Sequence, residues 1–196
     1  LSSFATVFHA LYQAGGVTDI GTLRNIRVLR SGREVASVDI YKYLFHGDSK
    51  DDIRLEEGDI VLVPSYDLLV EVTGCVKRPM RYEMEAGEPL SQLLAYAGGF
   101  TGDAYGREVR VVRTMGREHE LFSVDSVGYG TFALMDGDSV AVGRVLDRYA
   151  NRIEVQGAVY RPGMYELGEG THTVRELIGR AEGLREDAFR GRALLF

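Results

Sequence analysis

The sequence predicts an α+β fold built as a tandem array of one module, each module a small mixed sheet with one helix. Val-x-Gly followed by Arg-Pro and Tyr-Glu occurs at residues 72–83 and again at 155–166. Matching residues are a constant distance apart, as for Gly74 and Gly157 (157 − 74 = 83). The motif Ala-Gly-Gly-x-Thr at 14–18 recurs at 97–101, at the same spacing of 83 residues. This period exceeds a solenoid turn and suits a small domain.

The central copy is predicted to run strand, strand, helix, strand, strand, strand. Apolar and polar residues alternate over 69–76, which predicts a half-buried strand. Residues 77–79 are expected to form a turn around Pro79, and residues 81–84 a second strand that pairs with the first. A helix near 89–97 is opened by Pro89 and ended by a Gly-Gly pair. Further strands are expected at 109–113, 120–124 and 139–142. One helix across such a sheet is a two-layer sandwich with β-grasp order.

The flanking copies follow the same template in part. Residues 1–67 are predicted to hold a helix, a hairpin at 26–30 and 34–38, and a strand at 59–63; the apolar face of this helix comprises Phe4, Val7, Phe8 and Leu11. Residues 148–196 are predicted to hold the first hairpin and the helix, opened by a capping box of Thr173 and Glu176. Residues 68–147 are then the complete unit, and we expect the chain to be a piece of a longer protein.

Composition excludes several functions. The 196 residues carry a net charge of −6, so the basic surface that nucleic-acid binding requires is not expected. The single Cys75 can form neither an internal disulfide nor a CxxC metal or redox motif. No apolar run approaches the ~20 residues of a membrane span.

No residue pattern predicts catalysis, a cofactor or a metal site. Residues 128–133 match G-x-G-x-x-A, but strands are expected on both sides, whereas a dinucleotide site needs a helix after the motif. Glu83 and Glu166 lie in different repeats, each at the end of a strand, so we interpret both as rim carboxylates and not as an acid–base pair. The sequence therefore predicts a protein that is not an enzyme.

The repeated motif resembles a known family. Residues 155–170 read V-x-G-x-V-x-R-P-G-x-Y-E-x-x-x-G, and L-x-x-G-D-x-V-x-V occurs at 55–63 and 134–142. These patterns resemble the soluble-ligand-binding β-grasp (SLBB) repeats of the Wza-like outer-membrane polysaccharide export proteins. The resemblance implies a periplasmic assembly module of a capsular or exopolysaccharide exporter, attached to the outer membrane through other parts of the longer protein and contributing to a translocation channel.

The resemblance also implies partners: copies of the same protein in a ring, the polysaccharide, and an inner-membrane polysaccharide co-polymerase. The alternative is a monomeric module that binds a glycan or another small ligand. Tyrosine rings can stack on sugars, and the turn arginines can anchor ligands or stabilise the turns. The candidate glycan or inter-unit contacts are Arg78, Tyr82, Tyr105, Arg161 and Tyr165. Because Tyr82 and Tyr165 are equivalent, packing between modules is the preferred interpretation for that pair.

Overall fold

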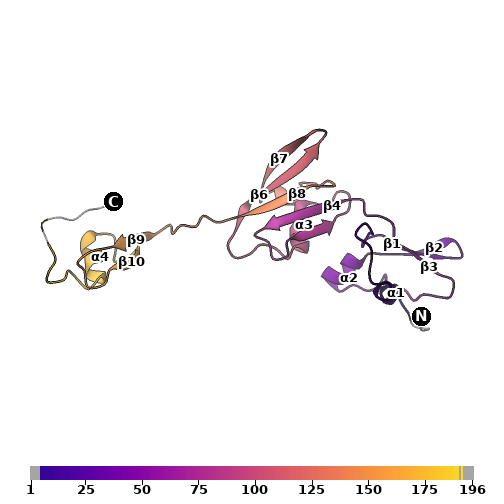
Figure 1. The fold of residues 1–196 in the computed structure, drawn as a ribbon, viewed down its shortest axis with the longest axis horizontal. Coiled ribbons are helices and arrows are strands. Elements are labelled where there is room, and N and C mark those ends of the chain that lie inside the picture. Colours follow the sequence, from indigo (N-terminus) through magenta and orange to yellow (C-terminus); the bar gives the residue numbers. More distant parts are fainter. Residues whose placement is uncertain (1–4, 190, 192–196) are drawn as a thin grey trace. The chain divides into compact units, whose positions relative to one another are not determined.

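The computed structural model describes residues 5–189 and 191, which excludes Phe4 of the expected first helix face. The chain forms two compact units, Leu1–Val145 and Leu146–Phe196, and each is described by itself (Figure 1). The first unit holds the first and second repeats, and the second unit holds the third repeat.

The second repeat is a β-grasp unit. Its elements are β4 (Leu69–Gly74), β5 (Met80–Glu83), α3 (Leu90–Tyr96), β6 (Ala104–Met115), β7 (Glu118–Asp125), the 3-10 helix η1 (Gly128–Gly130) and β8 (Ser139–Arg144). The sheet order is β5-β4-β8-β6-β7. The first and last strands, β4 and β8, pair in parallel at its centre, and the other pairs are antiparallel. The fold-class prediction is confirmed.

The helix α3 lies against one face of this sheet, as Figure 1 shows. The apolar residues of this helix recur at helical spacing on one face. This places Leu90 and Leu93 in the core, where both are fully buried. The sheet side chains in the same core include Val70, Val72, Val109, Val111 and Val140. The structure places Pro89 at the N-cap, one residue before the helical position expected from the sequence.

The first repeat contains α1 (Val7–Gln13), β1 (Ile26–Arg30), β2 (Arg33–Val38), α2 (Ile40–His46) and β3 (Ile60–Leu62). Its sheet has the order β2-β1-β3, matching β7-β6-β8 of the second repeat. The helix α2 was not predicted. Asp39 caps its N-terminus by accepting from the Tyr41 N–H, and Gly47 ends it in the left-handed conformation at φ 67°.

The third repeat contains β9 (Arg152–Val155), β10 (Gly163–Glu166) and α4 (Val174–Arg180). Its turn repeats the hydrogen bonds of the second repeat. The Tyr82 hydroxyl donates to the Arg78 carbonyl at 2.9 Å, and the Tyr165 hydroxyl donates to the Arg161 carbonyl at 2.6 Å. The predicted capping box at Thr173 is present.

An arginine–aspartate pair recurs beside the last strand of the first and second repeats; it is buried in the second repeat and partly exposed in the first. Arg30 Nε and Nη2 each donate to Asp59 at 2.9 Å, and Arg113 binds Asp138 in the same bidentate way at 2.8 and 2.7 Å. Each aspartate also accepts a backbone N–H three residues upstream, from Glu56 or Met135. This is the role of the aspartate in the L-x-x-G-D motif: it ties the turn before the last strand to the hairpin.

The first repeat should lose stability in acid because of Asp59. The hydrogen bond from Arg30, together with one from the Glu56 N–H, lowers the pKa of Asp59 from its usual 3.8 to about 2. The ionised form therefore stabilises the fold above pH 4, and this contribution is lost as the pH falls towards 2. Denaturant unfolding at several pH values should show Asp59→Asn and the unaltered chain converging over that range. A constant difference from pH 5 to 2 would contradict this, and Asp19→Asn, at an exposed site, serves as the control.

The parallel pairing of β4 with β8 requires glycine at position 74. Gly74 has a φ of 82°, and a Cβ there would lie 2.1 Å from the Val142 carbonyl oxygen. Its equivalent Gly157 has a φ of 100°, but no described atom outside its own neighbourhood lies within 4 Å of such a Cβ. Both positions favour glycine by conformation, and Gly74 adds a steric requirement.

Substituting alanine separates these two effects. Gly157→Ala should cost about 1–2 kcal/mol through backbone strain alone. Gly74→Ala should cost about 1–3 kcal/mol more, because β8 must move away from the new methyl group. Urea unfolding of the chain, monitored through NMR signals from each unit, measures both free-energy costs. Equal costs would show that the close approach of the two strands is wrong.

Candidate functional site

The buried carboxylate of Glu83 joins the first repeat to the second. Glu83 ends β5 and is 8% exposed. Its carboxylate accepts from the Thr22 hydroxyl and, at 2.7 Å, from the Leu23 N–H. The Glu83 N–H donates to the Tyr41 hydroxyl at 2.9 Å. The interpretation of Glu83 as a rim carboxylate is therefore wrong: the first repeat covers this strand end and supplies its partners.

An aromatic cluster surrounds this junction. The ring of Tyr41, on α2, lies 5.1 Å from that of Tyr96, on α3. Phe45, also on α2, lies 4.7 Å from Tyr96 and 6.4 Å from Tyr82. Tyr41 belongs to the same buried cluster as the core of the second repeat, and burial raises its pKa to about 12. The helix α2 thus extends the second repeat's core into the first.

Arg24 is the buried cation of the junction. Its guanidinium lies 2.6 Å from Glu88, 3.3 Å from Asp39 and 3.7 Å from Glu85. It also lies over the rings of Tyr41 and Tyr96, at 5.0 and 5.6 Å from their centroids. Burial alone would lower the pKa of Arg24, but the bond to Glu88 and the two nearby carboxylate charges outweigh it and raise the pKa. Arg24 therefore stays charged between the repeats.

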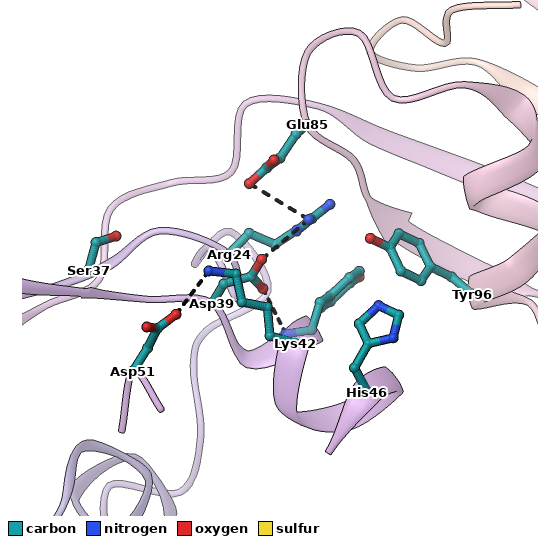
Figure 2. Close-up of a pocket in the computed structure, with 9 residues that line it drawn as sticks. Arg24, Ser37, Asp39, Lys42, His46, Asp51, Glu85 and Tyr96 are labelled. Atoms are coloured by element: carbon teal, nitrogen blue, oxygen red, sulfur yellow. Dashed lines mark hydrogen bonds and ion pairs between the residues drawn. The ribbon is translucent and has the colours of Figure 1, made fainter. Parts of the chain in front are cut away.

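A cavity of about 410 Å³ opens beside Arg24 (Figure 2). Side chains reach it from both repeats: α2 supplies Lys42 and His46, α3 supplies Tyr96, and the loop after β5 supplies Glu85. The full lining is Arg24, Ser37, Asp39, Tyr41, Lys42, His46, Asp51, Glu85 and Tyr96.

Most charged side chains that line this cavity are paired with a side chain of opposite charge. Lys42 Nζ donates to Asp51 at 2.9 Å, and this bond raises the pKa of Lys42. Three lining carboxylates face two permanent cations and His46. Within the described part of the chain, the Nε of Arg24 has no hydrogen-bond partner, although it is buried.

The predicted contact residues lie in several places. Tyr82 is 2% exposed and packs in the junction, and the Arg78 guanidinium lies 5.5 Å from the centroid of Phe45. Tyr105 is exposed on β6 and does not line the cavity. In Leu146–Phe196, Arg161 pairs with Glu182 at 2.6 Å. Tyr165 is half-buried and lines a smaller hollow of about 270 Å³.

The cavity was not predicted from the sequence, because α2, which supplies Tyr41, Lys42 and His46 to its lining, was not predicted. The signals were present: an N-cap aspartate, seven residues with alternating aromatic positions, and a glycine directly after them. The short helix does not recur in the second repeat, where η1 occupies the connection, so the repeat template gave no reason to expect it.

Among the described residues, no helix is long and apolar enough to cross a membrane, and no cluster of His, Cys, Asp and Glu is arranged to hold a metal ion.

The structure thus defines a tandem array of β-grasp modules. A family model, the SLBB domain, matches residues 1–39, 69–122 and 152–195, one segment in each repeat. This match covers more than half of the chain, and the chain belongs to the SLBB domain family. SLBB domains are ligand-binding domains that occur in polysaccharide export proteins.

Removing the Glu83 side chain should destabilise the first unit. Glu83→Ala leaves the Thr22 hydroxyl and the Leu23 N–H buried without their acceptor, a cost of about 1–3 kcal/mol. The matched control is the equivalent Glu166→Ala, because Glu166 is exposed and its one ion pair among the described residues is with the exposed Arg180 at 3.1 Å. That pair contributes about 0–1 kcal/mol. Urea midpoints that shift equally for both variants would contradict the buried role of Glu83.

Proposed function

We propose that this chain is a periplasmic structural and assembly module of a capsular or exopolysaccharide export protein. In this proposal, the longer protein that carries it is attached to the outer membrane and forms a ring of identical copies around a translocation channel. The polysaccharide and an inner-membrane polysaccharide co-polymerase are the further partners. The module acts through binding and spacing and performs no catalysis.

The observation that carries this proposal is the buried junction between two SLBB repeats. Glu83 and Arg24 are both buried, and their partners come from the other repeat or from both repeats. Removing one partner of a buried charge pair is strongly destabilising, by about 3–5 kcal/mol, so such a junction resists bending. A rigid pair of repeats suits a protein that must hold neighbouring copies at fixed spacing, because a closed ring needs one constant angle between unlike faces.

The test is the size of the protein in solution. The 196-residue chain should be monomeric or weakly associating, because a stable interface buries roughly 1,600 Å² and a small module offers little of that alone. The longer protein should form a closed oligomer. Multi-angle light scattering of both samples measures this, and a monomeric longer protein would overturn the assembly proposal.

The second candidate is a monomeric glycan- or small-ligand-binding module. The cavity beside Arg24 favours it, because about 410 Å³ falls within the roughly 300–1,000 Å³ of small-molecule sites. Tight binding of one small ligand by a monomeric longer protein would select this function.

A further inference from the structure

We propose that the cavity beside Arg24 binds an uncharged sugar residue of a glycan. The inference rests on the proposed function for the setting in which a glycan reaches the cavity, but its chemistry comes from the lining itself. The site lies between two repeats and is built by α2, α3, the end of β2, the segment before β1 and the loops that follow α2 and β5.

The lining is too polar for an apolar ligand. Most small-molecule sites are walled chiefly by apolar side chains with a few polar groups. Here Arg24, Ser37, Asp39, Lys42, His46, Asp51 and Glu85 all line the cavity, and the rings of Tyr41 and Tyr96 form the rest of its wall. Figure 2 shows these polar side chains converging from different segments. A ligand here must offer many hydrogen-bonding groups.

The charges of the lining disfavour an ionic ligand. The two permanent cations already have carboxylate partners: Arg24 pairs with Asp39 and Glu88, and Lys42 pairs with Asp51. Three lining carboxylates would repel a phosphate or a uronic acid. An ammonium ligand would have to compete with Arg24 and Lys42 for carboxylates that lie 2.9–3.7 Å from these cations.

The hydroxyl groups of a neutral sugar suit this lining of paired donors and acceptors. Each hydroxyl donates one hydrogen bond and accepts others, so it can insert between a donor and an acceptor that are already near one another. Lys42 and Asp51 form such a pair with side chains 53% and 39% exposed, and Glu85 is 59% exposed. Tyr96 also lines the cavity, and its hydroxyl donates to Glu88 at 3.1 Å, a further donor–acceptor pair of this kind.

The test is an NMR titration of the full 196-residue chain. The probes are neutral gluco-, galacto- and manno-disaccharides, with glucuronate, glucosamine and inorganic phosphate as charged probes. Saturable shifts in the amides of 37–51, 85 and 96 with at least one neutral disaccharide, and weaker shifts with the charged probes, are expected. Stronger binding of a charged probe would overturn the ligand class. No saturable shift with any neutral disaccharide would overturn the site.

Two variants at exposed lysines test whether the sugar binds in the cavity. Lys42→Ala should weaken the neutral disaccharide at least about fivefold, because a charged donor to a hydroxyl is lost. The matched control is Lys50→Ala, since Lys50 forms a similar exposed pair with Asp48 at 3.3 Å but does not line the cavity. Equal weakening by both variants would overturn the assignment. Both side chains are more than half exposed, so neither change should unfold the protein.

The outcome is separable from the assembly test. A longer protein that forms a closed oligomer while the chain binds no neutral sugar would overturn this inference alone. A monomeric longer protein whose cavity binds sugar would overturn the assembly proposal and leave this inference standing.

Discussion

Two buried charges of opposite sign, Glu83 and Arg24, fix the first repeat against the second. Neither can leave its place cheaply, because a buried charge without its partners costs several kcal/mol. Glu83 accepts hydrogen bonds from Thr22 and Leu23, and Arg24 pairs with Asp39 and Glu88. The aromatic side chains of α2 close the junction and join the second repeat's core. The cavity beside Arg24 lies in the same junction, and its lining comes from both repeats.

The repeats show how one local motif takes different environments. Tyr82 and Tyr165 make the same hydroxyl-to-carbonyl bond across the same turn. Tyr82 is nevertheless buried by Phe45 and Tyr96, whereas Tyr165 is half-buried in Leu146–Phe196. Glu83 and Glu166 differ in the same way. The motif therefore secures the turn in both repeats, and the role of its side chains depends on what covers them.

Most of the fold could be predicted because its signals are local. The alternation of 69–76, the spacing of Leu90, Leu93 and Leu94, and the capping box at Thr173 each act within a few residues. Because the offset between the repeats is constant, the elements predicted for the second repeat could also be assigned to the first and third. The helix α2 was not predicted, because it belongs to one repeat only and has no counterpart in the repeat template.

The sequence by itself determined the repeat, the β-grasp order of strands and helix, the turns and the family of the chain. The tertiary structure alone decided which polar residues are buried and which line the cavity. Glu83 meets Thr22 across 61 positions, and Arg24 meets Glu88 across 64. Partners this far apart leave no periodic or spacing signal, because their contact depends on how two folded modules pack together and not on any local preference of the chain.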